Sequence, residues 1–340
     1  MSTKEIQTIL RVLSSVSGPW ALATLVRVDG SSYRRAGARL LLTAAGARTG
    51  SISGGCLEDD VIERARTVLA TGAPQTVVYD TTNENDLVWG VGLGCHGVVR
   101  VLIEKLATRP NWADTLAENL RARRATSLGV VYGGSAPERL GTYLAEELPP
   151  LPDGTEVFRH EVPPPVPFVV GGAGDDARPL VRLAKELGWH VTVVDPRPAF
   201  ATTARFPEAD AVIVARPEEL ATRVSLDERT VAIVMTHHYA HDVPLLRQLL
   251  PQPLAYIGLL GPRKRAEKIL GDLAAQGLAL TPAMRARLHA PVGLDLGGDT
   301  PEAVALAILA EAQAVLSDRD ARPLRERSKP IHDQPGARIE

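Results

Sequence analysis

The chain contains two cysteines, Cys56 and Cys95, and each lies in its own glycine-rich segment. Cys56 ends the segment GSISGGC, which begins at Gly50 and leads into a predicted helix starting near Leu57. The N-terminus of a helix lowers the pKa of a thiol and favours the thiolate. The acidic run at 58–60 opposes that effect, because it repels a further negative charge. A reactive thiol and a buried structural cysteine are therefore both open interpretations of Cys56.

Cys95 lies in the segment GLGCHG, which spans residues 92–97. Glycines such as Gly94 let a ligand reach the backbone and leave the sulfur accessible. Two loop cysteines without a Cys-x-x-Cys pair match neither a zinc site nor a disulfide framework. Cys56 and Cys95 could instead make a pair of thiolates for a soft metal centre or for sulfur handling.

A further segment, GSSYRRAGAR, runs from Gly30 to Arg39 and is dense in hydrogen-bond donors. Serine hydroxyls and guanidinium groups suit an anionic ligand that is rich in oxygen. A plain surface turn between two strands is the alternative interpretation. The candidate ligand-binding residues of this segment are Ser31, Ser32, Arg34, Arg35 and Arg39.

The C-terminal half carries the glycine pattern VVGGAGDDA between a predicted strand at 168–170 and a predicted helix at 177–187. Gly172 would form the tight turn, and Gly174 would let a ligand approach the backbone. Asp195 ends the next predicted strand, where a dinucleotide site has its ribose-binding acid. The pattern predicts a Rossmann-type domain whose crevice could hold a nucleotide.

Asp175 and Asp176 complicate that nucleotide site. They stand at the start of the helix, where free N–H groups and the helix dipole would hold a pyrophosphate. Their carboxylates would repel a phosphate, and their side chains could cap the helix instead. The pattern therefore leaves open whether this crevice binds a nucleotide.

A histidine cluster follows the predicted strand at 231–235. It consists of His237, His238 and His241, with Asp242 beside them. Imidazole and carboxylate groups at the end of a strand could ligate a metal, but this spacing matches no specific metal motif. Loop histidines with Asp242 as a helix cap are the favoured interpretation.

The elements around these motifs divide the chain into two domains. Mixed helices and strands predict an α+β domain over 1–162, and four prolines at 163–167 predict a semi-rigid linker. From 168 to 317, short apolar strands alternate with helices, as in a buried parallel sheet. Residues 318–340 form a charged, proline-rich tail. We predict an α/β protein with an N-terminal mixed α+β domain and a C-terminal Rossmann-type parallel-sheet domain.

The composition excludes several classes of function. The 340 residues carry a formal net charge of -2, and aromatic residues make up 4% of the chain. Neither value fits a surface that binds nucleic acid, which needs a basic excess or a platform for base stacking. There is no apolar run long enough to cross a membrane, and the polar N-terminus does not match a signal peptide. We expect a cytoplasmic protein.

Four of these segments together resemble the XdhC/CoxI family. They are GSSYRRAGAR from Gly30, GSISGGCLE from Gly50, GLGC from Gly92 and PVGLDLGGDTPE from Pro291. The resemblance covers the chain from about residue 19 to residue 315. It implies an accessory protein for molybdenum hydroxylases such as xanthine dehydrogenase and carbon monoxide dehydrogenase. Family members bind the molybdenum cofactor, protect it while a cysteine desulfurase supplies its terminal sulfur, and pass it to the apo-enzyme.

The resemblance implies that molybdopterin, a pterin dithiolene with a phosphate, is the ligand of the N-terminal half. The cofactor-binding residues would be Ser31, Ser32, Arg34, Arg35, Arg39, Ser53, Gly54, Gly55, Cys56, Gly94 and Cys95. Cys56 and Cys95 would face the metal. Gly172, Gly174 and Asp195 would serve a nucleotide in the Rossmann crevice. The chain departs from the family pattern at His96, where a glycine is expected, and at Asp175, where relatives often have histidine.

Two other functions are compatible with the sequence. An NAD(P)-dependent oxidoreductase would use the Rossmann domain, with His238 or His241 as its acid or base. An interaction scaffold that binds no ligand is the other alternative, and it would not use the cysteines, serines and arginines of the loops. We favour the accessory protein, which would not itself turn over a substrate, and we expect a homodimer on grounds of symmetry alone.

Overall fold

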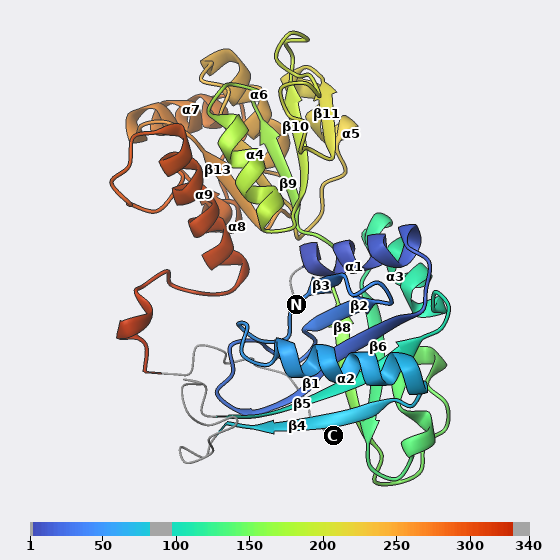
Figure 1. Ribbon diagram of the computed structural model, residues 1–340. Helices are drawn as coiled ribbons and strands as arrows, with labels where there is room; N and C mark the ends of the chain where they lie inside the picture. The colour runs from blue at the N-terminus through green and yellow to red at the C-terminus, as the bar shows by residue number, and fades with distance from the viewer. Residues whose placement is uncertain (1–2, 82–96, 329–340) are drawn as a thin grey trace. The chain divides into compact units, whose positions relative to one another are not determined.

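The computed structural model of the chain describes residues 3–81 and 97–328 (Figure 1). The chain divides between Pro164 and Pro165 into two compact units. The last strand of the N-terminal unit ends at Val162, and the first strand of the C-terminal unit begins at Pro167. Gly94, Cys95 and His96 lie outside the described residues.

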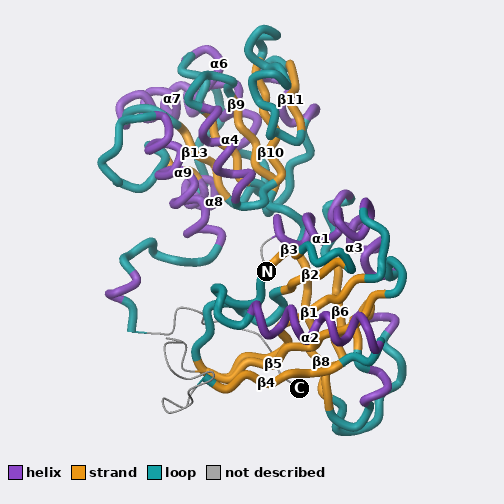
Figure 2. The backbone as a smooth tube through the Cα atoms, viewed as in Figure 1, coloured by secondary structure: helices purple, strands orange, loops and turns teal. Residues whose placement is uncertain are grey.

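The N-terminal unit is built on a five-stranded antiparallel sheet with the strand order β3-β2-β1-β5-β4 (Figure 2). Its strands are β1 (Trp20–Gly30), β2 (Arg39–Thr43), β3 (Arg48–Gly50), β4 (Gln75–Asp80) and β5 (Gly97–Leu106). The central strand β1 pairs with β5 over its whole length, from Trp20 opposite Leu106 to Gly30 opposite Gly97. Strand β1 therefore lies at the centre of the sheet, between β2 and β5.

Both faces of this sheet are covered, because alternate side chains of a strand point to opposite faces. Ala23 and Leu25 of β1 enter a core with helix α2, whereas Trp20 and Leu22 enter a second core with helices α1 and α3. The helices are α1 (Thr3–Ser15), α2 (Glu58–Thr71) and α3 (Asn111–Arg121). Each carries its buried residues at helical spacing, as Ile6, Ile9, Leu10 and Leu13 do in α1.

A smaller three-stranded antiparallel sheet closes the second core, with the order β7-β6-β8. Its strands are β6 (Thr126–Gly133), β7 (Gly141–Leu144) and β8 (Glu156–Val162), with 3₁₀ turns η1 (Pro137–Arg139) and η2 (Ala145–Glu147). Leu128, Leu144 and Val162 bury their side chains against α1, α3 and the large sheet. This packing makes a buried layer between the two sheets.

The C-terminal unit is a parallel six-stranded sheet with the order β11-β10-β9-β12-β13-β14. The strands are β9 (Pro167–Gly171), β10 (His190–Asp195), β11 (Ala211–Val214), β12 (Val231–Val234), β13 (Tyr256–Leu259) and β14 (Leu288–His289). The helices are α4 (Ala177–Glu186), α5 (Leu220–Arg223), α6 (Tyr239–Leu249), α7 (Arg263–Ala275), α8 (Pro282–Arg287) and α9 (Pro301–Leu316), with 3₁₀ turns η3 (Pro217–Glu219) and η4 (Leu324–Glu326). The predicted combination of an α+β domain and a Rossmann-type domain is confirmed.

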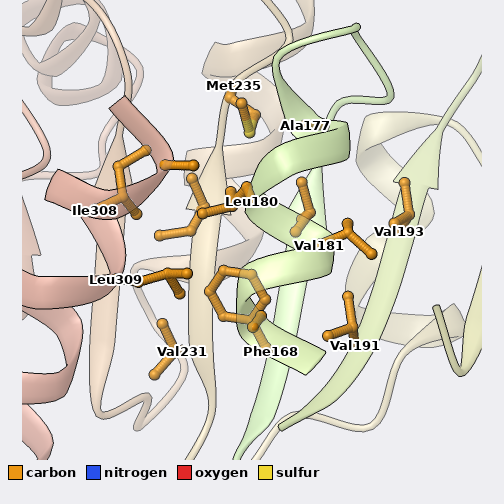
Figure 3. Packing of buried hydrophobic residues seen from close by; sticks show 14 of the residues in the cluster. Phe168, Ala177, Leu180, Val181, Val191, Val193, Val231, Met235, Ile308 and Leu309 are labelled. Carbon is orange, nitrogen blue, oxygen red and sulfur yellow. The ribbon is translucent and has the colours of Figure 1, made fainter. Parts of the chain in front are cut away.

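The packing of this sheet follows the rule that parallel strands are buried on both faces. On one face Phe168, Val191 and Val231 meet Leu180 of α4 and Leu309 of α9 (Figure 3). On the other face Val169 and Val234 pack with residues of α6 and α7. Thr300 caps the last helix, α9, because its side chain accepts a hydrogen bond from the backbone N–H of Ala303. Among the helices of the two described ranges, none has both the length and the apolar character to span a bilayer.

Candidate functional site

Strand pairing in the N-terminal unit brings the predicted loop segments to one end of the large sheet. Gly30 ends β1 and lies opposite Gly97, the first residue of β5. Gly50 ends β3 opposite Leu40 near the start of β2, and Asp80 ends β4 opposite Val98. The first loop (residues 31–38) and the second loop (residues 51–57) therefore leave the same end of the sheet, where β4 ends and β5 begins (Figure 2).

The first loop packs tightly on the ends of β4 and β5. A Cβ atom at Gly97 would lie 2.3 Å from the backbone oxygen of Ser31, so only glycine fits there. Thr81 Oγ1 donates to the Gly97 oxygen at 2.7 Å and accepts from the Gly97 N–H at 3.2 Å. This close approach fixes Ser31 beside Thr81.

The carboxylate of Glu58, the first residue of α2, shapes the second loop. Its Oε1 accepts hydrogen bonds from Ser51 Oγ at 2.8 Å and from the Ser53 N–H at 2.8 Å, and its Oε2 accepts one from Ser53 Oγ. Ser53 Oγ in turn accepts from the N–H groups of Gly55 and Leu57, each at 3.1 Å. Burial raises the pKa of the Glu58 carboxyl, but the hydrogen bonds from Ser53 and Ser51 outweigh it and hold that pKa below its usual value.

The compact turn presents Cys56 to solvent. Gly55 has a φ of +116°, a conformation that residues with a side chain rarely adopt. Cys56 follows with an exposed side chain, two residues before the start of α2. The interpretation of Cys56 as a buried structural cysteine is therefore wrong.

Two of the three acids expected to oppose a thiolate have other partners. Glu58 accepts the loop hydrogen bonds, and Asp60 accepts from Arg64 Nε and from Tyr79 Oη, each at 2.6 Å. Asp59 is exposed on α2. Glu58 therefore keeps its negative charge among neutral hydrogen-bond donors, whereas the charge of Asp60 is paired with that of Arg64.

A small pocket opens between the two loops and the end of β4. Its volume is about 20 Å³, and the residues around it include Ser31, Ser32, Tyr33, Ser53, Cys56 and Thr81. The structure thus brings together four of the predicted residues, Ser31, Ser32, Ser53 and Cys56, from two separate loops. Gly54 and Gly55 are exposed beside them. Gly94 and Cys95 lie outside the described residues, so their predicted roles remain predictions.

The three predicted arginines, Arg34, Arg35 and Arg39, do not form one cationic cluster at the loop surface. Arg34 forms an ion pair with Glu5 of α1, which ties the loop to that helix. Arg35 is exposed. Arg39 is the first residue of β2, and its side chain is fully buried between the two sheets. The expectation that Arg39 meets the ligand at the loop surface does not fit this burial.

The guanidinium of Arg39 lies 5.9 Å from the centre of the Trp112 ring. None of its nitrogen atoms has a hydrogen-bond partner among the described residues. Burial lowers the pKa of Arg39 to about 10, and the nearby Glu104 carboxylate partly counteracts that. Sequence pattern alone could not place Arg39 inside, because the second sheet that buries it is distant in the chain.

Glu104 of β5 and His160 of β8 share this buried layer. Glu104 accepts hydrogen bonds from the N–H and Oγ1 of Thr142, at 3.1 and 2.5 Å. The ring of His160 stacks on Phe158 with centroids 5.6 Å apart. A Cβ atom at Gly37 of the first loop would lie 3.0 Å from His160 Nε2, so the His160 ring packs closely against that loop. Burial and the charge of Arg39 lower the pKa of His160 to about 3.

The glycine turn of the C-terminal unit has the predicted Rossmann geometry. Gly172 has a φ of +124°, and a Cβ atom there would lie 2.6 Å from the backbone oxygen of Met235. Ala177 is fully buried where α4 meets the sheet. A Cβ atom at Gly174 would lie 2.6 Å from Asp176 Oδ1, so the turn is tight there as well.

Asp195 occupies the predicted position, but its oxygens are already engaged. Oδ1 accepts from the N–H and Nε of Arg197, each at 2.9 Å, and Oδ2 accepts from Arg197 Nη2 and from the Ala173 N–H, each at 2.8 Å. A carboxylate offers about four acceptor positions. These four hydrogen bonds use them, so a ribose diol could bind Asp195 only by breaking one. Despite the cost of burial, the hydrogen bonds from Arg197 hold the pKa of Asp195 low.

The two acids at the start of α4 contact side chains outside the helix and do not cap it. Asp175 accepts from Arg205 Nη2 at 2.8 Å, and Asp176 Oδ2 lies 2.7 Å from His237 Nε2. Asp176 is the N-cap residue, yet its side chain makes no capping hydrogen bond. The interpretation of these acids as helix caps is therefore wrong.

The histidine cluster forms no metal site within the described residues. His237 contacts Asp176, and the rings of His238 and His241 lie 4.7 Å apart. Asp242 lies in the first turn of α6 rather than at its cap, where it binds Thr236 Oγ1 and Arg265. The expected cap at Asp242 is therefore wrong.

Sequence reasoning missed three residues of the pocket region. From the sequence, Glu58 is only a charge near Cys56, because a glutamate in the first turn of a helix is common and does not itself indicate hydrogen bonds to the preceding loop. Thr81 and Tyr33 carried no signal, because neither has a motif of its own. Only the strand pairing brings Thr81 to the first loop.

Comparisons with known proteins cover both units. Residues 15–80 match the XdhC and CoxI family, and residues 168–312 match the XdhC Rossmann domain. The chain is similar to a probable xanthine dehydrogenase subunit of Bacillus subtilis, with 32% identity over 89% of this chain and 95% of that protein. It is also similar to the molybdenum cofactor insertion chaperone PaoD of Escherichia coli, with 24% identity over 92% of this chain and 89% of that protein. The crystal structure of a xanthine dehydrogenase from Bacillus halodurans superposes with a TM-score of 0.78, at 30% identity, over 96% of this chain and 99% of that one.

Proposed function

Because this chain belongs to the XdhC and CoxI family, we propose that it is an accessory protein that binds the molybdenum cofactor and delivers it to a molybdenum hydroxylase. The observation that carries the proposal is the pocket between the first and second loops, where the exposed Cys56 thiol meets serine hydroxyls. The name of the Escherichia coli relative, a molybdenum cofactor insertion chaperone, supports the same function.

The chemistry of the pocket fits a pterin dithiolene that carries a soft metal. A cysteine sulfur is a soft ligand, suited to a metal centre that already carries sulfur. The hydroxyls of Ser31 and Ser32 can donate to or accept from the heteroatoms of a pterin. Ser53 contributes differently, because its hydroxyl already binds Glu58 and the loop backbone. It holds Gly54 and Cys56 in place for the ligand.

The exposure of the site suits a protein that transfers its bound cofactor to another protein. Cys56, Gly54 and Gly55 are all exposed, so a bound cofactor would remain accessible from outside. A cysteine desulfurase could then supply the terminal sulfur, and an apo-hydroxylase could take the cofactor. The proposal therefore includes two partner proteins, a cysteine desulfurase and an apo-hydroxylase.

The oxidoreductase alternative has no comparable support from the Rossmann crevice. A dinucleotide would need Asp195 for its ribose, and that carboxylate is bonded to Arg197 and Ala173. Its side chain is 1% exposed. We therefore propose no nucleotide for this crevice.

The test is retention of the cofactor by purified protein. The wild-type chain, Cys56→Ala and Thr67→Ala would each be produced in cells with an intact cofactor pathway, and their molybdenum and molybdopterin contents would be measured. Thr67 is the control, because it is exposed on α2, carries no charge and does not line the pocket. We expect Cys56→Ala to retain at least roughly tenfold less cofactor, comparable to the loss of a ligand-supporting group at a metal site. Equal retention by all three proteins would refute the role of the thiol.

A further inference from the structure

Tyr33 presents an aromatic ring to solvent at the mouth of the pocket. Its exposed fraction is 66%, whereas every other phenylalanine, tryptophan and tyrosine side chain of the two described ranges is buried or half-buried. Trp20, Trp112 and Tyr79, for example, are 3%, 3% and 2% exposed. An open aromatic face next to a pocket is typical of a surface that stacks on a ligand.

The ring of Tyr33 is supported from the second loop. A Cβ atom at Gly54 would lie 3.4 Å from two of its carbons, which is van der Waals distance, so the ring lies close to the backbone of Gly54. The next residue, Arg34, is anchored to Glu5 of α1. The ion pair of Arg34 therefore anchors the backbone next to Tyr33, while much of the ring remains uncovered.

The groups around the ring suit a planar heterocycle. Ser32 and Cys56 line the same pocket and supply polar and sulfur atoms beside the aromatic face. The pocket itself, at about 20 Å³, has room only for about one water molecule. A larger ligand must therefore lie across its mouth, where the Tyr33 ring is.

We propose that Tyr33 is the stacking platform for the planar ring system of the ligand bound at this pocket. The proposal rests on the proposed function, in which that ring system is the pterin. Stacking places the two ring planes in contact and needs no specific hydrogen bond, as in the binding of nucleic-acid bases by aromatic side chains. Tyr33 thereby orients the pterin, and the serines and Cys56 bind its polar and metal-bearing parts.

The test compares four full-length proteins, the wild type, Tyr33→Phe, Tyr33→Leu and Tyr33→Ala. Each would be incubated over a range of concentrations with molybdenum cofactor freshly released from a hydroxylase, and the protein-bound cofactor would be separated by gel filtration, oxidised and quantified by the fluorescence of the oxidised pterin. Phenylalanine keeps the aromatic face, leucine keeps only apolar bulk, and alanine keeps neither. Because the Tyr33 ring is exposed, we expect the four proteins to unfold at the same urea concentration, which circular dichroism would check.

We expect Tyr33→Phe to bind as the wild type does, and Tyr33→Leu and Tyr33→Ala to bind on the order of tenfold more weakly. Equal binding by all four proteins would overturn the stacking role and leave the proposed function intact. Tight binding by Tyr33→Leu with weak binding by Tyr33→Ala would also overturn it, because bulk alone would then be enough. Failure of the wild type to bind would refute the proposed function, and the stacking role with it.

Discussion

Lowering the pH from 7.5 to 5 should weaken the N-terminal unit through the side chain of His160. This ring is stacked on Phe158 and supports Gly37 of the first loop. Burial and the positive charge of Arg39 lower its pKa to about 3, while the pKa of an unfolded histidine is about 6.5. Burial raises the pKa of Glu104, which faces the same layer, so its proton uptake opposes this loss in both the wild type and a His160 variant.

The sign follows from proton linkage. Between pH 6.5 and 3 the unfolded chain binds a proton at His160 that the folded chain does not bind, so stability falls as the pH falls. With folded and unfolded pKa values of about 3 and 6.5, the loss at pH 5 is about 2 kcal/mol relative to pH 7.5. Replacement by phenylalanine keeps a flat ring on Phe158 but cannot bind the proton.

Hydrogen exchange read by mass spectrometry is the suitable assay, because it reports the N-terminal unit separately from the C-terminal one. Peptides from β1 and β5 of the wild type should lose about 2 kcal/mol more protection on going to pH 5 than the same peptides of His160→Phe. Comparing the two proteins at the same pH cancels the intrinsic effect of pH on exchange. An equal loss in both proteins would refute the assignment of acid sensitivity to His160.

Two further predictions concern the second loop and the Rossmann crevice. Gly55→Ala should destabilise the protein by about 1–3 kcal/mol, because φ is +116° there, whereas Gly54→Ala should change stability by less than about 1 kcal/mol. Urea denaturation would measure both, and equal effects would contradict the strain argument. Calorimetric titration with NADH or NADPH should show no binding, because Arg197 and Ala173 already use the oxygens of Asp195. Micromolar binding of either dinucleotide would refute that reasoning.

Much of the fold could be predicted from local patterns. Gly172 and the short apolar strands around it indicate a Rossmann turn without reference to distant residues, and Thr300 marks the start of the last helix. Helix α3 escaped prediction because Pro110 precedes it without a capping side chain, although Trp112, Leu116 and Leu120 are buried at helical spacing. Patterns of this kind predict elements well when both the cap and the apolar stripe are present.

The site was harder to predict because its residues depend on distant partners. Cys56 was recognised from its loop, but its exposure follows from hydrogen bonds that Glu58 makes with the turn. Arg39 looked like a surface cation, and only the second sheet buries it. Asp195 was found at the expected position, yet its bonds to Arg197 change what it can bind. Spacing locates a side chain, whereas tertiary packing determines which of its atoms remain available.

Transfer of the cofactor tests the central claim most directly. Protein purified with bound molybdenum cofactor would be mixed with apo-xanthine dehydrogenase, and the activity that appears would be compared with that from the same amount of free cofactor. We predict that the loaded wild-type protein restores more activity than free cofactor, and that protein carrying Cys56→Ala does not. Restoration no better than that by free cofactor would contradict the account.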